Sequence, residues 1–163
     1  MSNNNIVIRE ISKADNKQIA QVIRDVLVEF GAPKVGTAYE DVSLDDMAKT
    51  YNRERSAYFV IEREGKILGG AGVAPLVGLE EHICELQKMY FLTEVRGMGL
   101  GEELMKKCLE NAKAFGYKKC YLETLPYMDA ARKLYTKVGF ETLDKPMGNT
   151  GHYSCNVWMI KEL

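Results

Sequence analysis

A short glycine-rich segment, Arg96–Gly101, has the composition of an anion-binding loop. It lies between a predicted strand and a predicted helix. Glycines allow backbone N–H groups to approach a bound anion closely, and a helix N-terminus adds about half a positive charge. The guanidinium group of Arg96 can pair with a phosphate in two places. A diphosphate is therefore the expected ligand, and a plain strand-to-helix turn is the alternative.

Two common nucleotide-binding motifs do not fit this loop. A P-loop needs Gly-Lys-Ser/Thr at the start of the helix, but Gly101 is followed by two glutamates, Glu102 and Glu103. A dinucleotide fingerprint, G-x-G-x-x-G, needs a glycine where this chain has Glu102, and it belongs to an early strand–helix–strand unit. The sequence therefore argues against both classes of nucleotide-binding protein.

Hydrophobic periodicity and turn residues predict the elements that position the loop. Predicted strands are Ile6–Ile11, Ala57–Glu64, Lys66–Pro75, Ile83–Leu92, Lys118–Thr124, a strand restarting at Gly139-Phe140, and His152–Lys161. Predicted helices run from Asp15 to Phe30, with Gln18 as a capping-box partner, and over Leu44–Asn52 after Ser43, Glu102–Phe115 and Met128–Val138. Small residues in Leu68–Gly72 indicate a bulge or close backbone packing. We expect an α/β (α+β) fold with a mixed, mostly antiparallel sheet of about six to seven strands and about four flanking helices.

Composition excludes several classes of protein. The 163 residues suit one domain, 1–163, and the 22 Lys+Arg nearly balance the 23 Asp+Glu, so we expect no nucleic-acid partner. Uncharged runs such as Ile67–Leu79 are shorter than the roughly 18–20 apolar residues of a membrane span, so we expect no membrane partner. The polar start lacks the layout of a signal peptide, and the four cysteines are widely spaced. We therefore expect a cytoplasmic protein with reduced thiols.

Two segments resemble the GCN5-related N-acetyltransferases (GNAT family). The acyl-CoA loop of that family has the form Q/R-x-x-G-x-G/A, which Arg96, Gly99 and Gly101 fill. A later signature, A-x-x-L-Y-x-K-x-G-F, is matched at every defined position by Ala131–Phe140. The resemblance implies the GNAT architecture, acetyl-CoA as a co-substrate, and direct acetyl transfer to a primary amine.

The resemblance also implies which residues contact the cofactor. The backbone of Met89, Tyr90 and Phe91 would face the pantetheine and the thioester, opposite Leu122–Thr124, and ordinary sheet core is the alternative for these strand residues. The pyrophosphate loop would comprise Arg96, Gly97, Met98, Gly99, Leu100 and Gly101. One position departs from the family, because Met128 stands where many members carry a cofactor-contacting asparagine.

Acyl transfer to an amine needs a base for the amine, a hydrogen bond to the oxyanion, and a proton for the leaving thiolate. Tyr135 occupies the position where the family often has its general acid, and the alternative is a half-buried core tyrosine. Glu85 is the candidate base, acting directly or through a water, because a carboxylate in an apolar strand is costly unless solvated or paired. The alternative is an outward-facing glutamate, since strand alternation places Glu85, Gln87 and Met89 on one face.

The acceptor is expected to be a small-molecule amine or a peptide or protein amine. Loops on a rigid scaffold usually carry recognition, so Phe30–Val42 and Pro146–Tyr153 are candidates, with Phe30, Tyr39 and His152 as pocket residues. The His82/Cys84 and His152/Cys155 pairs lack structural zinc spacing, so no metal is expected.

A homodimer is a possible assembly. The alternative function is a non-catalytic acyl-CoA-binding sensor or interaction module on the same fold. The presence of both Glu85 and Tyr135 argues against that alternative, because a protein that only binds needs neither.

Overall fold

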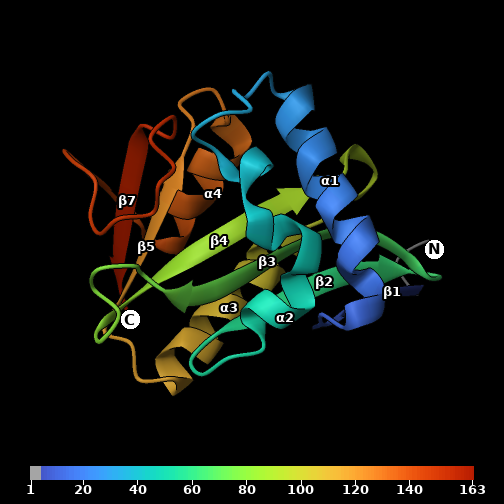
Figure 1. The fold of residues 1–163 in the computed structure, drawn as a ribbon, viewed down its shortest axis with the longest axis horizontal. Helices are drawn as coiled ribbons and strands as arrows, with labels where there is room; N and C mark the ends of the chain where they lie inside the picture. The colour runs from blue at the N-terminus through green and yellow to red at the C-terminus, as the bar shows by residue number, and fades with distance from the viewer. Residues whose placement is uncertain (1–4) are drawn as a thin grey trace.

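The computed structural model describes residues 5–163, which form one seven-stranded sheet with helices on both faces (Figure 1). The strand order is β1-β2-β3-β4-β5-β7-β6, and every neighbouring pair is antiparallel except β4 and β5. The strands are β1 (Ile6–Glu10), β2 (Ala57–Arg63), β3 (Lys66–Pro75), β4 (Ile83–Phe91), β5 (Lys119–Thr124), β6 (Glu141–Leu143) and β7 (Val157–Glu162). This arrangement confirms the mixed, mostly antiparallel sheet that the sequence predicts.

Four α-helices occur in the described part of the chain: α1 (Asn16–Glu29), α2 (Met47–Tyr51), α3 (Leu100–Ala114) and α4 (Asp129–Val138). Short 3-10 turns are η2 (Lys13–Asp15), η3 (Ala38–Glu40), η4 (Val42–Asp46) and η5 (Thr93–Val95). One apolar core joins α3 to the sheet, with apolar residues of α4 packed against it. A second core joins α1 and α2 to the opposite face.

The parallel strands β4 and β5 pair over only three residues. Their register runs from Ile83 opposite Lys119 to Glu85 opposite Tyr121, and β4 then continues to Phe91 without a partner in β5 (Figure 1). In contrast, β5 is paired with β7 along its whole length. A gap therefore opens in the middle of the sheet, beyond Glu85.

A bulge in β4 shapes this gap. Lys88 has a φ of 51°, and the pairing with β3 changes register between Gly70 and Gly72. Before the bulge, Leu86 faces the core on the α3 side, whereas after it Met89 does so. The bulge therefore breaks the simple alternation on which the sequence analysis placed Glu85 and Met89 on one face.

The small residues of β3 allow neighbouring side chains to cross the strand. A Cβ atom on Gly70 would lie 2.6 Å from the Tyr58 ring, and one on Gly69 would lie 2.7 Å from the Phe91 ring. The sequence predicted either a bulge or close packing here, and the structure contains both.

Two predicted boundaries are wrong. The last strand begins at Val157 rather than His152, because the preceding residues form turns in which the Cys155 N–H donates to the His152 carbonyl (3.0 Å). The predicted helix Leu44–Asn52 is divided into η4 and α2, and Asp46 rather than Ser43 accepts the capping bond, from the Lys49 N–H.

The predicted capping box at the start of α1 is also wrong. Gln18 does not cap the helix, because its amide reaches the β2–β3 hairpin, where it accepts from the Ile67 N–H (3.0 Å). Ser12 and Asp15 form a capping box one turn earlier, in η2.

Asp15 anchors the start of α1 to β1 through an ion pair, which leads to a stability prediction. Its carboxylate accepts two bonds from the Arg9 guanidinium (2.7 and 2.9 Å) and one from the Ser12 N–H. The pairing with Arg9 holds the pKa of Asp15 below its usual value. Asp15→Asn is expected to lower the free energy of unfolding at pH 7 by about 2 kcal/mol, because hydrogen bonds to charged groups are worth about 1.5–3 kcal/mol.

The pH dependence of this effect follows from the sign of the shift. A carboxyl whose pKa is depressed by folding stabilises the protein above its unfolded pKa of about 3.9 and loses that contribution as the pH falls. Urea unfolding of Asp15→Asn and of the exposed control Glu110→Gln, at pH 7 and pH 3, measures it. A difference from the unmodified protein that is as large at pH 3 as at pH 7 would contradict the ion-pair explanation.

Candidate active site

The gap beside β4 contains two cavities that share lining residues. The larger, of about 300 Å³, lies between β4, the glycine loop, α4 and the end of α1. The smaller, of about 50 Å³, lies between β4 and β5. Both cavities are lined by Met89, Tyr90, Met128 and Ala131. The two cavities are therefore neighbours, one beside the glycine loop and one between the strands of the sheet.

The glycine loop has the backbone conformation that its composition predicts. Gly97 and Gly99 have φ values of 76° and 77°, in the left-handed region that favours glycine, and Gly99 is the N-cap of α3. A Cβ atom on Gly101 would lie 3.0 Å from the Leu134 side chain, so a small residue lets α3 approach α4. The first turn of α3 thus opens onto the larger cavity with its N–H groups available to an anion.

Eight of the nine predicted cofactor-binding residues line the larger cavity. These residues are Met89, Tyr90, Phe91, Arg96, Gly97, Gly99, Leu100 and Gly101. Met98 does not line it and packs against the apolar core instead. Phe30, a predicted pocket residue, lines this cavity too, so it lies on the side of the glycine loop.

Arg96 already has partners in this structure. Its guanidinium donates to the Phe91 carbonyl (2.9 and 2.7 Å) and forms two bonds with the Glu29 carboxylate at the end of α1 (2.7 and 2.8 Å). It also lies over the Phe30 ring, 5.3 Å from the centroid. Sequence reasoning assigned Arg96 to a phosphate and did not foresee Glu29, which comes from a helix far earlier in the chain.

Tyr135 lies on α4 and reaches the smaller cavity. Its side chain is buried, with the ring packed edge-on against Phe140. Burial raises the pKa of the Tyr135 phenol above its usual value, so the hydroxyl stays protonated at neutral pH. Among residues 5–163 the hydroxyl has no hydrogen-bond partner, and it is therefore available to a ligand in the cavity.

Glu85 is buried at the last paired position before β4 and β5 separate. Its Oε1 accepts from the Gln87 Nε2 (2.7 Å). Burial, together with the nearby Glu123 carboxylate, raises the pKa of Glu85 to about 7, against the opposing effects of Gln87, His152 and Lys88. The alternative of an outward-facing strand glutamate is wrong, because the side chain is only 6% exposed.

Two ionisable side chains lie close to Glu85: His152, which the sequence analysis selected as a pocket residue, and Glu123, which it did not. Atoms of Glu85, Glu123 and His152 lie within 4.8 Å of one another. Glu123 lines the smaller cavity and accepts hydrogen bonds from the Tyr121 and Thr150 hydroxyls. Each Glu123 carboxylate oxygen already accepts a hydrogen bond from a hydroxyl, so we do not assign a metal to this cluster. It links Glu85 to the cavity that Tyr135 lines.

His152 forms an ion pair with Asp41. Its Nε2 lies 2.9 and 3.0 Å from the two carboxylate oxygens, and the Lys88 ammonium lies 3.4 Å from the same carboxylate. Burial disfavours the imidazolium, but the Asp41 carboxylate holds the pKa of His152 above its usual value. His152, a predicted pocket residue, also lies within 4.8 Å of Glu85. Tyr39 lies elsewhere, beneath Arg24 and Lys34.

The two loops proposed for acceptor recognition meet at the Asp41–His152 pair, and Ser154, which directly follows the second loop, extends the contact. The Ser154 N–H donates to the Gly36 carbonyl (2.9 Å), and the Ser154 hydroxyl donates to the Val35 carbonyl (2.8 Å). A Cβ atom on Gly36 would lie 2.5 Å from the Ser154 hydroxyl. Together with the Asp41–His152 pair, these contacts make one wall beside the site from two distant parts of the chain.

Comparison with known proteins identifies the class of protein. The family model described as the acetyltransferase (GNAT) family matches residues 21–140, which include the larger part of α1, the glycine loop and α4. The chain therefore belongs to the acetyltransferase (GNAT) family, as the two sequence segments predicted.

Particular relatives agree with this assignment. The chain is 45% identical, over 158 residues, to a protein of Escherichia coli (strain K12) described as uncharacterized N-acetyltransferase YjgM, covering 96% of this chain and 95% of that protein. A GNAT-family acetyltransferase from Staphylococcus aureus Mu50 superposes with a TM-score of 0.80 at 18% identity, over 96% of this chain and 98% of that one. A putative acetyltransferase from Salmonella typhimurium, solved with its cofactor acetyl-CoA, superposes with a TM-score of 0.75 at 17% identity, over 98% of this chain and 94% of that one. The protein is an N-acetyltransferase of this family.

No helix within residues 5–163 is long and apolar enough to cross a lipid bilayer.

Proposed function

We propose that the protein transfers an acetyl group from acetyl-CoA to a primary amine, with Glu85 as the base and Tyr135 as the acid. One observation carries the proposal: the buried carboxyl of Glu85 and the hydroxyl of the buried Tyr135, which has no partner among residues 5–163, both lie near the gap between β4 and β5. Glu85 itself lines neither cavity but lies within 4.8 Å of Glu123, which lines the smaller one, and a water is proposed to connect Glu85 to an amine bound there.

The glycine loop and β4 supply the cofactor contacts in this proposal. The pyrophosphate binds at the N-terminus of α3, where backbone N–H groups and the helix dipole favour negative charge. The pantetheine runs along the segment of β4 that has no partner in β5. The thioester then lies in the gap, close to Tyr135.

The reaction follows from these positions. Glu85 accepts a proton from the ammonium form of the acceptor, and the amine nitrogen attacks the thioester carbonyl to form a C–N bond. When the tetrahedral intermediate collapses, the C–S bond breaks and Tyr135 donates its proton to the departing sulfur. The nitrogen loses its second excess proton, which restores the Tyr135 phenol and leaves a neutral amide. Burial raises the pKa of the Tyr135 phenol, so the hydroxyl carries its proton at neutral pH when the sulfur departs.

The acceptor is proposed to be a cation before it reacts. The Glu123 carboxylate lies within 4.8 Å of Glu85 and has no cationic partner within salt-bridge distance in the described residues, whereas Asp41 is paired with Lys88 and His152. A primary ammonium is favoured there by its charge. Small amines and peptide or protein amines both satisfy this requirement.

A release assay for free thiol tests the proposal. The purified protein is incubated with acetyl-CoA and a panel of small amines, amino acids and peptides, and longer acyl donors are included. Amine-dependent release of CoA, accompanied by an acetylated amine in the mass spectrum, supports it. Tight acetyl-CoA binding without release for any amine would favour the non-catalytic sensor instead.

The Arg96–Glu29 pair gives a prediction about cofactor affinity. The Arg96 guanidinium must exchange the Glu29 carboxylate for a phosphate before it can bind the cofactor. Glu29→Gln is therefore expected to lower the Kd of acetyl-CoA by about fivefold at low salt, since charge-assisted bonds are roughly twice as strong as neutral ones. Calorimetry measures the effect, with Glu110→Gln as the exposed control. An unchanged Kd would mean that the pyrophosphate binds without Arg96.

A further inference from the structure

We infer that Tyr51 is a positioning residue for acetyl transfer, acting through Gln87 to hold the Glu85 carboxyl in its orientation. The inference rests on the proposed role of Glu85 as the base. It adds Tyr51 and Gln87, which have no role in the reaction steps proposed above. Tyr51 ends the short helix α2, Gln87 lies on β4, and neither lines the two cavities of the site.

The hydrogen bonds run in one direction from Tyr51 to Glu85. The Tyr51 hydroxyl donates to the Gln87 Oε1 (2.6 Å), and the Gln87 Nε2 donates to the Glu85 Oε1 (2.7 Å). Within residues 5–163 the Tyr51 hydroxyl has no other acceptor, so its proton fixes which end of the amide faces Glu85. An amide nitrogen facing a carboxyl favours the ionised form, which is the form that acts as a base.

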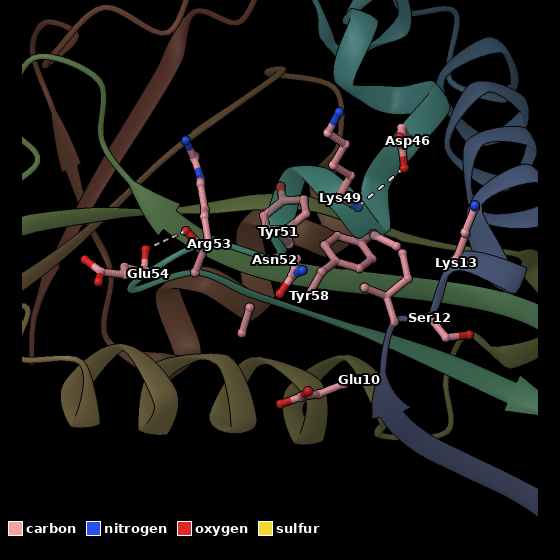
Figure 2. A pocket seen from close by; sticks show the side chains of 14 residues that line it. Glu10, Ser12, Lys13, Asp46, Lys49, Tyr51, Asn52, Arg53, Glu54 and Tyr58 are labelled. Atoms are coloured by element: carbon pink, nitrogen blue, oxygen red, sulfur yellow. Dashed lines mark hydrogen bonds between the residues drawn. The ribbon is translucent and has the colours of Figure 1, made fainter.

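Tyr51 is suited to remain a donor. Its side chain is buried, and burial raises the pKa of its phenol well above the usual value. Figure 2 shows its ring beside the ring of Tyr58, at the base of a groove of about 770 Å³ between β1, α2 and β2. The ring centroids are 5.0 Å apart, so the tyrosine is held by packing rather than by its hydroxyl alone.

Tyr58 provides a matched comparison. It is equally buried and aromatic, and its hydroxyl also donates to β4, but to the Lys88 carbonyl (2.7 Å) rather than to Gln87. Removing either hydroxyl costs one buried hydrogen bond to the same strand. Only the Tyr51 hydroxyl connects to Glu85.

Other ionisable groups also act on Glu85 and would be unchanged in a Tyr51 variant. They are Lys88 and Tyr90 from β4, Tyr121 and Glu123 from β5, and Asp41, His152 and Cys155 from the two contacting loops. A shift in the titration of Glu85 on removal of the Tyr51 hydroxyl therefore reports the path through Gln87.

The test follows the Glu85 carboxyl directly by NMR of protein carrying ¹³C at the glutamate side-chain carboxyl. The signal that disappears in Glu85→Gln belongs to Glu85. In Tyr51→Phe the Gln87 amide is free to turn its oxygen toward Glu85. An amide oxygen in that place can accept a hydrogen bond only from the protonated form of the carboxyl. The titration midpoint is expected to rise by about one pH unit, whereas Tyr58→Phe leaves it unchanged. The acidic limb of the pH profile of kcat/KM for the best amine moves by the same amount.

Two results would overturn the inference: an unmoved midpoint in Tyr51→Phe, or an equal shift in Tyr58→Phe. If Tyr51→Phe does not fold, Gln87→Leu removes the donor at the other end of the path and is expected to raise the midpoint at least as far. The titration needs no turnover, so it is independent of the base assignment. Full activity in Glu85→Gln would refute the base, while an unmoved midpoint would refute the path from Tyr51.

Discussion

Glu85→Gln is expected to lower kcat for acetyl transfer by about 10²–10⁴-fold, the range that a positioned general base contributes. Glu85 is the buried carboxyl at the fork of β4 and β5, and its pKa is raised to about 7, mainly by burial. Its ionised form accepts the proton, so kcat/KM of the unmodified enzyme rises with pH through about 7 and then levels off. The glutamine introduced at position 85 retains the contact with Gln87 but cannot accept the proton. The rise of kcat/KM with pH, which is the acidic limb of the profile, therefore disappears.

Glu123→Gln separates the charge effect from the loss of the base. Burial is the main cause of the raised pKa of Glu85, and the Glu123 carboxylate adds to it. Removing that negative charge lowers the pKa, so the acidic limb is expected to move toward lower pH. Steady-state rates from pH 5.5 to 9 with one amine measure both effects. A Glu85→Gln enzyme that keeps the limb at its original position would show that another group is the base.

Tyr135→Phe is expected to lower kcat by about 100-fold while the KM for acetyl-CoA changes by less than about threefold, because the lost interaction belongs to the transition state. The hydroxyl lines the cavity between β4 and β5 and has no partner among the described residues, so its removal leaves no protein group unsatisfied. Stability should therefore change little, whereas protonation of the departing sulfur is lost.

The choice of acyl donor makes this test specific. A thioester whose thiol has a lower pKa needs less help in leaving, so the deficit of Tyr135→Phe is expected to shrink with such a donor. Tyr117→Phe is the control, because Tyr117 is a buried tyrosine whose hydroxyl donates to the Arg55 carbonyl, away from the site. A deficit that is the same for every donor would argue for a structural role of the Tyr135 hydroxyl.

Local sequence signals predicted much of the fold. The Glu64-Gly65 turn signal between two predicted strands indicated a hairpin that the structure contains. Gly97 and Gly99 adopt left-handed conformations that favour glycine. The A-x-x-L-Y-x-K-x-G-F signature placed Tyr135 on a helix beside the gap, where the structure has it.

The remaining features depend on contacts between distant segments. The spacing of Glu85 and Met89 does not predict the positive φ at Lys88. That φ changes the face of the sheet on which the following residues lie. The partner of Arg96 comes from α1, and the partner of His152 comes from the loop before η4. The function proposed for Glu85 was accessible from sequence, but the groups that shift its pKa were not.

The contact between the two loops beside the site has a consequence for how acceptor range changes among relatives. Ser154 binds the backbone of Val35 and Gly36, while His152 pairs with Asp41, so each loop forms part of the surface against which the other is folded. If only one of these loops were replaced by the loop of another family member, it would lack the matching contacts with the other loop. Acceptor preference is therefore expected to be inherited, and engineered, as a two-segment module in which residues 31–42 and 148–155 are exchanged together.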